Sequence, residues 1–529
     1  MKINLPRSYH SAIYFFGLAI LVIGLPLSMF LMSLAQIVLL LNWLWEGHLK
    51  EKICKFWNNK AAVIIASVFI LHLIGLLYTS DFDYGLEDIR KKIPLFLLPL
   101  ILSSSEKISL KKLHWILHIF IAAVLCSTFI SMSVFFGYIP TDPPQTVIVD
   151  VRDISIFIAA IRLALLICIC IFTLAYYIYT EKSTSKKYFF ALLILWFIIF
   201  MIILESITGL LVLFLVSFIL LIYLAWKQHK RIFFALMILL PIIVFAYAAM
   251  RIHQYDKMPP KINFSTLEKK TSQRNLYFND STSTLSENGH FVMMYICWNE
   301  LETSWNRRST IKFDQKDLKG NDIKYTLIRF LTSKNERKDA VGVNTLSDAE
   351  IFSIQKGIPN YKYQHLGNLN ARLYQLLGDI HTFENNENPS GHSVSQRLSY
   401  WKAAIGIIQR NPLIGVGTGD VKNAFAAEYI REKSPLKVEE RLRSHNQFLA
   451  IGVAFGIIGF AWFVLSLVYP LLREKGFSNY FYITFFLIAL LSMFSEDTLE
   501  TQAGATFFAF FNAFFLFNNF SFKNEKIDE

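Results

Sequence analysis

The chain has 529 residues, of which 54% are hydrophobic and only 17% are charged, and its formal net charge is +12. Soluble domains carry about 25% charged residues, so this composition excludes an ordinary soluble protein. In a soluble protein the positive charge would suggest a nucleic-acid partner. Here most Lys and Arg residues lie in short segments between apolar runs, as membrane orientation requires, so no nucleic acid is expected. The five cysteines match neither a disulfide framework nor a metal-ligand spacing.

Apolar runs that could cross a membrane recur through the first half of the chain. Residues 12–45 are too long for one span and are interrupted by Leu25-Pro-Leu27, which predicts a helical hairpin. No small-residue cleavage site follows the first run, so it is interpreted as a retained span. Further apolar runs lie at 61–78, 93–102 (short and bent), 113–136, 154–179, 188–204, 208–226 and 232–250.

The sequence is polar and mixed from residue 251 to about residue 442, with no apolar run of span length. Helices are predicted here at 370–384, at 395–410 and at 420–433, the last with Asp420 as its cap. The pattern over 264–362 does not distinguish helix from strand. Apolar runs resume at 445–469, 480–494 and 503–520.

The sequence therefore predicts an all-α polytopic membrane protein with about twelve transmembrane helices and one large, mostly helical outer loop domain before the last three spans. Residues 1–250 are the N-terminal bundle of about nine spans, 251–444 the loop domain and 445–520 the C-terminal spans. Basic residues in alternate connections place both termini in the cytoplasm and the large loop outside.

The run Arg90-Lys91-Lys92 is the exception to this charge pattern, because it falls in an outer connection. Either that span end is misplaced, or these charges face an anion. The second explanation makes Arg90 a candidate substrate-binding residue.

Arg162 lies about two turns into the predicted span that begins at Ile154. An arginine at that depth is costly unless it is paired or faces a wet cavity, which favours a functional residue over one that only snorkels to the interface. No acidic residue of the same span lies at helical spacing from it. A substrate anion is therefore a natural partner.

His445 follows Arg441 by four residues at the start of an apolar run, so on a helix both would share one face. A neutral imidazole can take a proton from a hydroxyl near neutral pH. A histidine that only caps the span explains the local sequence equally well.

Arg397 and Trp401 form another pair at helical spacing. A guanidinium fits phosphate oxygens, and an aromatic face suits a sugar ring. The competing explanation, stronger on these residues alone, is a packing stripe of Tyr400, Ala404 and Ile408 with Arg397 in solvent.

Two further patterns are weak. The segment Gly415-Val-Gly417-Thr-Gly419 lacks the lysine and the strand of a nucleotide phosphate loop and is predicted to be a turn. Asp81-Phe-Asp83 matches a pair of carboxylates that can hold a divalent metal, but a pair at a span end is usually only solvated. The scattered histidines suggest no zinc site.

Four motifs follow one another in the second half of the chain: Arg397-Leu-Ser-Tyr-Trp401, Asn411-Pro-Leu-Ile-Gly-Val-Gly417-Thr-Gly419, His445-Asn446-Gln-Phe-Leu449 and Gly456-Ile-Ile-Gly459. In order and spacing they resemble the O-antigen ligase and polymerase superfamily of bacterial inner membranes. The similarity is strongest over 390–465, and residues 190–465 are most similar to the ligase-related domain. Arg162 resembles an arginine of the family. Ser206-Ile-Thr-Gly209 departs from it, since many members carry a basic residue after the serine.

The resemblance implies a metal-independent membrane glycosyltransferase of the O-antigen ligase type that uses no cofactor. Members take a glycan from undecaprenyl pyrophosphate at the periplasmic face of the inner (cytoplasmic) membrane and pass it to a hydroxyl, which for ligases belongs to lipid A-core. In this family His445 would be the general base. Arg162 and Arg397 would hold the pyrophosphate with support from Arg441 or Arg443, and Trp401 would be a platform for the sugar.

Three alternatives remain open at the level of sequence. An O-antigen polymerase and a protein O-oligosaccharyltransferase share the donor and the chemistry. The single dominant outer loop favours a ligase, because polymerases more often divide their polar residues between two loops. A flippase or exporter of lipid-linked glycans belongs to a different class and would need charges along many spans, whereas most of these spans carry none.

Overall fold

The residues described in the computed structural model are 6–139, 151–227, 267–280, 285–318, 320–365, 383 and 393–518. The chain divides into two compact units: unit 1 comprises residues 1–224 and 396–529, and unit 2 comprises residues 225–395. The helix predicted at 232–250 lies outside the described residues, and so does the one predicted at 370–384 apart from residue 383.

The described chain is mostly helical, as the sequence predicts. Up to residue 227 its elements are α1 (Arg7–Leu27), α2 (Met29–Trp45), α3 (Leu49–Asn58), α4 (Lys60–Gly75), η1 (Leu76–Tyr78), α5 (Phe82–Lys92), α6 (Pro94–Ser104), α7 (Leu110–Phe135), η2 (Val151–Ile154), α8 (Ala160–Thr180), α9 (Thr184–Ile203) and α10 (Ile207–Lys227).

Beyond residue 266 the chain first completes unit 2 and then returns to unit 1. The elements are β1 (Ser286–Glu287), β2 (His290–Phe291), α12 (Trp298–Arg308), α13 (Ile323–Ser333), α14 (Ala340–Asn344), α15 (Asp348–Gln355), α16 (Lys362–His365), α18 (Ser393–Arg410), α19 (Val421–Arg431), η4 (Val438–Glu440), α20 (Gln447–Arg473), η5 (Gly476–Ser478), α21 (Tyr480–Ser492), η6 (Thr498–Glu500) and α22 (Gln502–Phe517).

Several of these helices are membrane spans. Within the described residues, seven helices are long and apolar enough to cross a membrane, or eight if α2 and α3, which are bent by 115° at their junction, are counted as one span. The helices α21 and α22 are apolar but shorter. Only 17% of the apolar window of α9 and of α10 is buried, so most of that surface needs an apolar solvent such as lipid. The total of about twelve spans stays a prediction.

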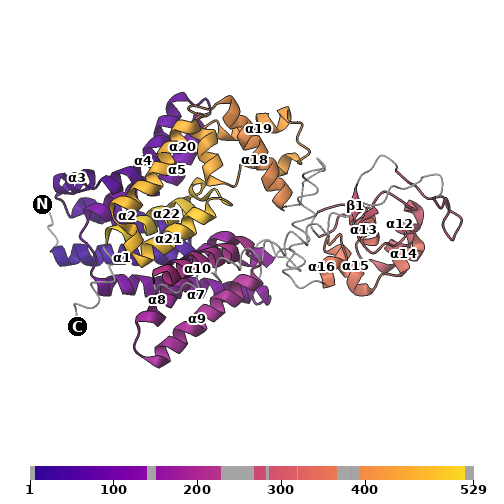
Figure 1. Cartoon of the computed structure of the whole chain (residues 1–529), viewed down its shortest axis with the longest axis horizontal. Helices are drawn as coiled ribbons and strands as arrows, with labels where there is room; N and C mark the ends of the chain where they lie inside the picture. The colour runs from indigo at the N-terminus through magenta and orange to yellow at the C-terminus, as the bar shows by residue number, and fades with distance from the viewer. Residues whose placement is uncertain are drawn as a thin grey trace. The chain divides into compact units, whose positions relative to one another are not determined.

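The core of unit 1 is built around the last helix. Every residue from Ala503 to Phe517 in α22 is buried, and the helix packs against α6, α21 and α5 (Figure 1). A helix that is apolar on all sides belongs in a core. The predicted hairpin is also present: α1 and α2 pack closely, and the Ser28 hydroxyl caps α2 by accepting from the Leu31 amide.

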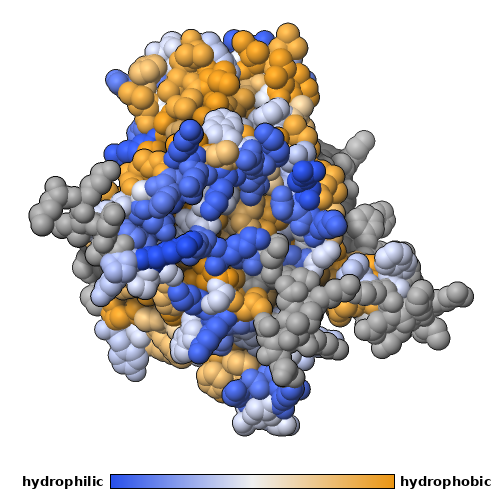
Figure 2. Space-filling model, turned by 90° about the vertical axis from the view of Figure 1, so that its left-hand side faces the viewer, coloured by the Kyte–Doolittle hydropathy of each residue, from blue (hydrophilic) through white to orange (hydrophobic). Residues whose placement is uncertain are grey.

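Figure 2 views the molecule from the side on which α3 lies in Figure 1. Hydrophilic residues gather in a band across the middle of this face, and hydrophobic residues cover much of the surface above it. Such a boundary is expected where spans end at a membrane surface.

A break in α20 ties this helix to the glycine-rich segment before α19. Gly456 has a φ of 61°, which interrupts the helix and leaves carbonyls without helical donors. The Val453 and Ala454 carbonyls accept instead from the Val416 and Gly417 amides, at 3.0 and 2.9 Å. Gly417 also has a positive φ, of 87°. The predicted turn at 415–419 is thereby confirmed. Its backbone amides donate hydrogen bonds to carbonyls of α20.

Replacing Gly456 with alanine is expected to destabilise the protein by about 2 kcal/mol or more, because a left-handed φ and a steric collision combine there. A Cβ at this position would meet the backbone of Leu413 and Ile414. Thermal unfolding in detergent micelles measures the effect. Gly452→Ala on the same helix is the control, since its Cβ would meet only the tip of the Ile408 side chain. Equal losses in the two variants would contradict this account.

Unit 2 has a hydrophobic core of its own. Trp305 of α12 is fully buried, and its indole N–H donates to the Ile311 carbonyl at 2.9 Å. Leu327 of α13 and Ile354 of α15 pack into the same cluster. The region that the sequence leaves undecided between helix and strand is thus mainly helical, with one pair of two-residue strands in its described part.

Candidate active site

The candidate site of unit 1 is organised by the connection between α21 and α22. This acidic connection (residues 493–501) carries Glu496, Asp497 and Glu500. The start of α20 fixes it: Gln447 donates its side-chain amide to Glu500 at 3.2 Å and accepts from the Leu499 amide at 2.7 Å. Three carboxylates are therefore held in place beside the segment that contains His445.

His445 lies at the junction between an irregular segment and α20. Its side chain is 33% exposed, and its Nδ1 lies 3.7 Å from Oδ1 of Asp497. Its φ is 46°, in the left-handed region. Histidine tolerates that region better than most residues, and backbone strain of this kind is typical of functional sites. The next residue, Asn446, caps α20 by accepting from the Leu449 amide at 3.1 Å.

The prediction that Arg441 and His445 share a helix face is wrong. The helix begins only after its Asn446 cap, so Arg441 lies in irregular backbone. Its guanidinium donates to the Leu436 and Ser434 carbonyls, at 3.1 and 3.3 Å. In the structure Arg441 shapes the segment that leads to His445.

Arg397 reaches the acidic connection from α18. Its Nη2 lies 3.1 Å from Oε1 of Glu496, so the alternative of a purely solvated Arg397 is not supported. The packing stripe that the same alternative predicts is present, because Tyr400 is buried in the core. The indole N–H of Trp401 donates to the Ser444 carbonyl at 3.0 Å, next to His445.

Arg162 lies closer to the end of its helix than the sequence predicts. The helix α8 starts at Ala160 because residues 155–159 are irregular, so Arg162 is in the first turn and not two turns inside. It lines a cavity together with Glu496, Leu25 and Phe507. Its charge also interacts with Glu496 and Asp497. The acidic partners that are absent from its own span come from the acidic connection.

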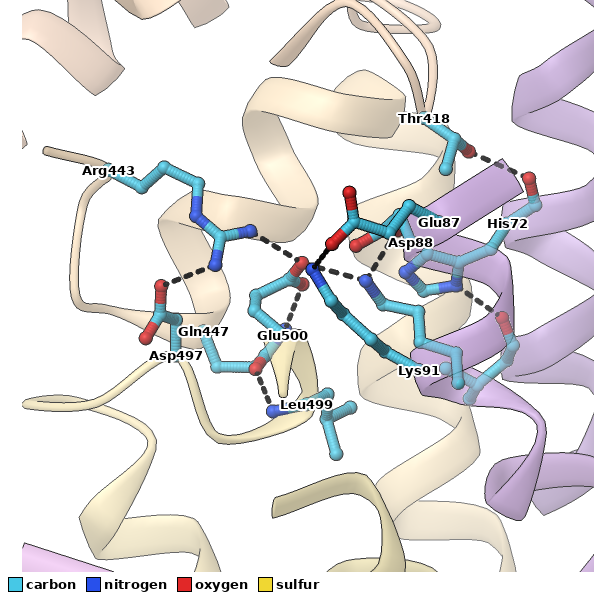
Figure 3. Close-up of polar contacts among 12 residues, drawn as sticks. His72, Glu87, Asp88, Lys91, Thr418, Arg443, Gln447, Asp497, Leu499 and Glu500 are labelled. Carbon is cyan, nitrogen blue, oxygen red and sulfur yellow. Dashed lines mark hydrogen bonds and ion pairs between the residues drawn. The ribbon is translucent and has the colours of Figure 1, made fainter. Parts of the chain in front are cut away.

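Arg443, labelled in Figure 3, and Lys92 complete the set of cations. Arg443 lies 3.1 Å from Glu500 and 3.7 Å from Asp497. Lys92 of α5 is fully buried and lies 2.7 Å from Glu500 and 2.6 Å from Asp88.

The anion-facing role of Arg90 stays a prediction. Arg90 is exposed on α5, and Lys91 pairs with Glu87 at the surface. One face of α5 turns into the protein, and Lys92 is the member of the basic run that lies on it.

The surroundings of Glu496 and Glu500 shift the pKa values of these two carboxyl groups in opposite directions. Burial raises the pKa of Glu496, and the charges of Arg397 and His445 only partly oppose this. Burial also acts to raise the pKa of Glu500, but the Lys92 and Arg443 charges outweigh it and hold that pKa well below its usual range. Near neutral pH the ion pairs of Glu500 are therefore fully charged, whereas Glu496 is the carboxyl that more readily takes a proton.

The two carboxylates singled out at 81 and 420 are structural. Asp81 caps α5 by accepting from the Tyr84 amide at 3.1 Å. Asp420 does not cap α19 with its side chain as predicted. Its carboxylate accepts from the Ser80 amide and hydroxyl and from the Asp81 amide, at 2.7–2.9 Å. The segment between α4 and α5 therefore supplies the hydrogen bonds that this carboxylate accepts, in place of the first amides of α19.

Sequence reasoning missed Asp88, Lys92, Glu496, Asp497 and Glu500. The signal that could have found them is the Ser-Glu-Asp-Thr-Leu-Glu segment at 495–500, which separates two apolar runs. Three carboxylates in so short a connection between apolar helices mark it as a candidate site, because carboxylates that become buried there need cations to face them.

The site therefore belongs to a polytopic helical membrane protein in which guanidiniums and a histidine converge on an acidic connection. Residues 347–464 match the model of a protein family described as O-Antigen ligase. The matched segment contains Arg397, Trp401, Arg441, Arg443 and His445. This match confirms the resemblance to the O-antigen ligase and polymerase superfamily and indicates a glycosyltransferase-like enzyme. No curated protein matches the chain.

Proposed function

We propose that this protein is a membrane glycosyltransferase of the O-antigen ligase type. It transfers an oligosaccharide or polysaccharide from undecaprenyl pyrophosphate to an acceptor hydroxyl, with O-antigen as the glycan and lipid A-core as the acceptor. One observation carries the proposal: Arg397 of α18, Arg162 of α8 and His445 of the irregular segment before α20 all lie around the acidic connection, Arg397 beside Glu496, His445 beside Asp497 and Arg162 in a cavity shared with Glu496. The family match over the segment that holds two of these residues supports it.

The arrangement supplies what such a transfer needs. His445 takes the proton of the acceptor hydroxyl, and the oxygen then attacks the anomeric carbon of the glycan. The bond from that carbon to the pyrophosphate oxygen breaks, and the electron pair leaves with the pyrophosphate. Arg162 and Arg397 balance the charge that develops on this leaving group. Asp497, which faces Nδ1 of His445, stabilises the imidazolium.

The proposed topology follows the charge pattern of the sequence. About twelve spans cross the inner membrane, both termini lie in the cytoplasm, and the site faces the periplasm. The acidic connection between α21 and α22 carries no basic residue, which supports its placement on the outer side. The sugar platform at Trp401 remains a proposal of the same kind.

Deletion of the gene in its native host tests the function, with lipopolysaccharide gels and analysis of lipid-linked glycan as readouts. A lost ladder with long polymer stranded on the carrier supports a ligase. A core that carries a single repeat would instead identify a polymerase. Unchanged lipopolysaccharide with unglycosylated proteins would identify a protein O-oligosaccharyltransferase. Restoration by the wild-type gene, but not by a His445→Asn gene, links the result to this site.

Transfer by the purified enzyme is expected to persist in excess EDTA. The possible ligand atoms of His445, Glu496 and Asp497 all lie within 4.8 Å of one another, so this geometry alone would admit a divalent cation. Arg397 already pairs with Glu496 and Arg443 with Asp497, however, and a cation there would be repelled by both guanidiniums. A loss of transfer in EDTA that Mg²⁺, Mn²⁺ or Zn²⁺ restores would contradict metal independence.

A further inference from the structure

We propose that Lys92 is a positioning residue for glycan transfer: through Glu500, Arg443 and Asp497 it sets the electrostatic environment of His445. Lys92 lies on α5, a helix outside the matched family segment. The inference rests on the proposed role of His445 as the base.

A chain of alternating charges connects the two residues. Nζ of Lys92 lies 2.7 Å from Oε2 of Glu500, and the same oxygen lies 3.1 Å from Nη1 of Arg443. Nη2 of Arg443 lies 3.7 Å from Asp497, which in turn lies 3.7 Å from Nδ1 of His445. Figure 3 shows Glu500 facing Arg443 on one side and an amino group of α5 on the other.

The burial of Lys92 explains why its effect is carried along this chain. None of its side chain is exposed, so its charge is not screened by water and must be met by protein groups. Asp88, one turn earlier on α5, meets part of it, and Glu500 meets the rest. Lys92 therefore competes with Arg443 for Glu500 and leaves Arg443 partly available to Asp497.

Loss of the Lys92 charge would change how Arg443 is shared between Glu500 and Asp497. Glu500 would then rely on Arg443 alone, which would draw the guanidinium away from Asp497. The Asp497 charge would act more fully on His445 and favour the imidazolium, which cannot act as a base.

The charged partners of Lys92 are Asp88 and Glu500, so Lys92 contacts none of the groups that face His445 directly. Glu496 and Asp497 come from the acidic connection, and Arg397 and the Tyr400 ring come from α18. Arg443 is the charged group of its own segment that contacts Asp497. Removal of Lys92 should therefore act on His445 through Arg443 and Asp497.

The test compares Lys92→Met with Lys91→Met in the full-length protein. Lys91 is the matched control, since it is the next residue on α5 and pairs with Glu87 at the surface. Diethyl pyrocarbonate acylates a histidine only when its imidazole is neutral, and mass spectrometry reports the labelling of His445 itself as a function of pH. We expect the midpoint of this curve to rise by about half a pH unit or more in Lys92→Met and to stay unchanged in Lys91→Met. The acid limb of the transfer rate should move by the same amount.

Glu500→Gln gives a second test with the opposite sign. It removes the negative partner of Arg443, so the guanidinium turns more fully to Asp497 and the labelling midpoint falls. This variant also keeps the proposal testable if Lys92→Met does not fold. Unchanged midpoints, or shifts of the same sign in the two folded variants, would overturn the proposal. Opposite shifts in a protein whose wild type transfers no glycan would support the linkage and would refute the proposed function separately.

Discussion

Replacing His445 with asparagine is expected to lower the rate of glycan transfer by about 1,000-fold, the scale of a lost general base. Asparagine also tolerates a left-handed backbone such as the φ of 46° at this position, so the segment before α20 should keep its shape. Its amide cannot take the proton of the acceptor hydroxyl. The measurement is the initial rate of transfer from a purified lipid-linked glycan to its acceptor in detergent or liposomes.

His48→Asn is the matched control for this variant. His48 also has a left-handed φ, of 53°, and its Nδ1 lies 3.9 Å from a carboxylate of Glu51. It is the residue before the first turn of α3, makes no side-chain capping hydrogen bond, and lies far from the acidic connection in the sequence. This control should transfer glycan at the wild-type rate. A fully active His445→Asn enzyme would refute the role of His445 as the base, whatever the control does.

Replacing Arg397 with glutamine is expected to lower kcat/KM by about 100-fold, because one of the two guanidiniums that balance the pyrophosphate is lost. The donor pyrophosphate would take the place that Glu496 now occupies at 3.1 Å from Arg397. Arg397→Lys should recover only part of the activity, since an ammonium keeps the charge but not the two-pronged geometry. Steady-state kinetics with varied donor concentration measures both variants.

Arg410→Gln is the control on the same helix. Arg410 also pairs with a buried carboxylate, that of Glu428, but it lies at the other end of α18. Its loss should reduce stability modestly and leave kcat/KM unchanged per folded molecule. If Arg410→Gln and Arg397→Gln lower kcat/KM equally, the effect of Arg397 is on the helix and not on the donor.

The helices and several membrane spans were predictable because the signal is local. An apolar run of about 20 residues has few structures open to it, since its backbone must satisfy its own hydrogen bonds in lipid. The hairpin of α1 and α2, the long helix α20 and the turn at 415–419 follow from such local patterns. The residues of the matched family segment were likewise recognisable from their order and spacing.

The errors fall where the backbone is irregular. Arg162 lies less deep than predicted because residues 155–159 are mostly apolar but not helical, so α8 starts only at Ala160. Arg441 was placed on a helix that in fact starts after Asn446. Asp420 was assigned to its own helix, although a segment 340 residues away binds its carboxylate. In each case the competing partner or break is not visible in the neighbouring sequence.

The sequence by itself determined that the chain is a helical membrane protein, where most of its helices lie, and that His445, Arg397 and Arg162 are the residues to examine. Only the tertiary structure decided what these residues face. Arg443 meets Glu500 from 57 residues away, and Lys92 meets the same carboxylate from 408 residues away. The physical reason is that apolar periodicity acts over one or two helical turns, whereas ion pairing between distant segments is fixed by how the helices pack. The acidic connection at 493–501 became a site only when packing brought the cations of α5, α8 and α18 to it.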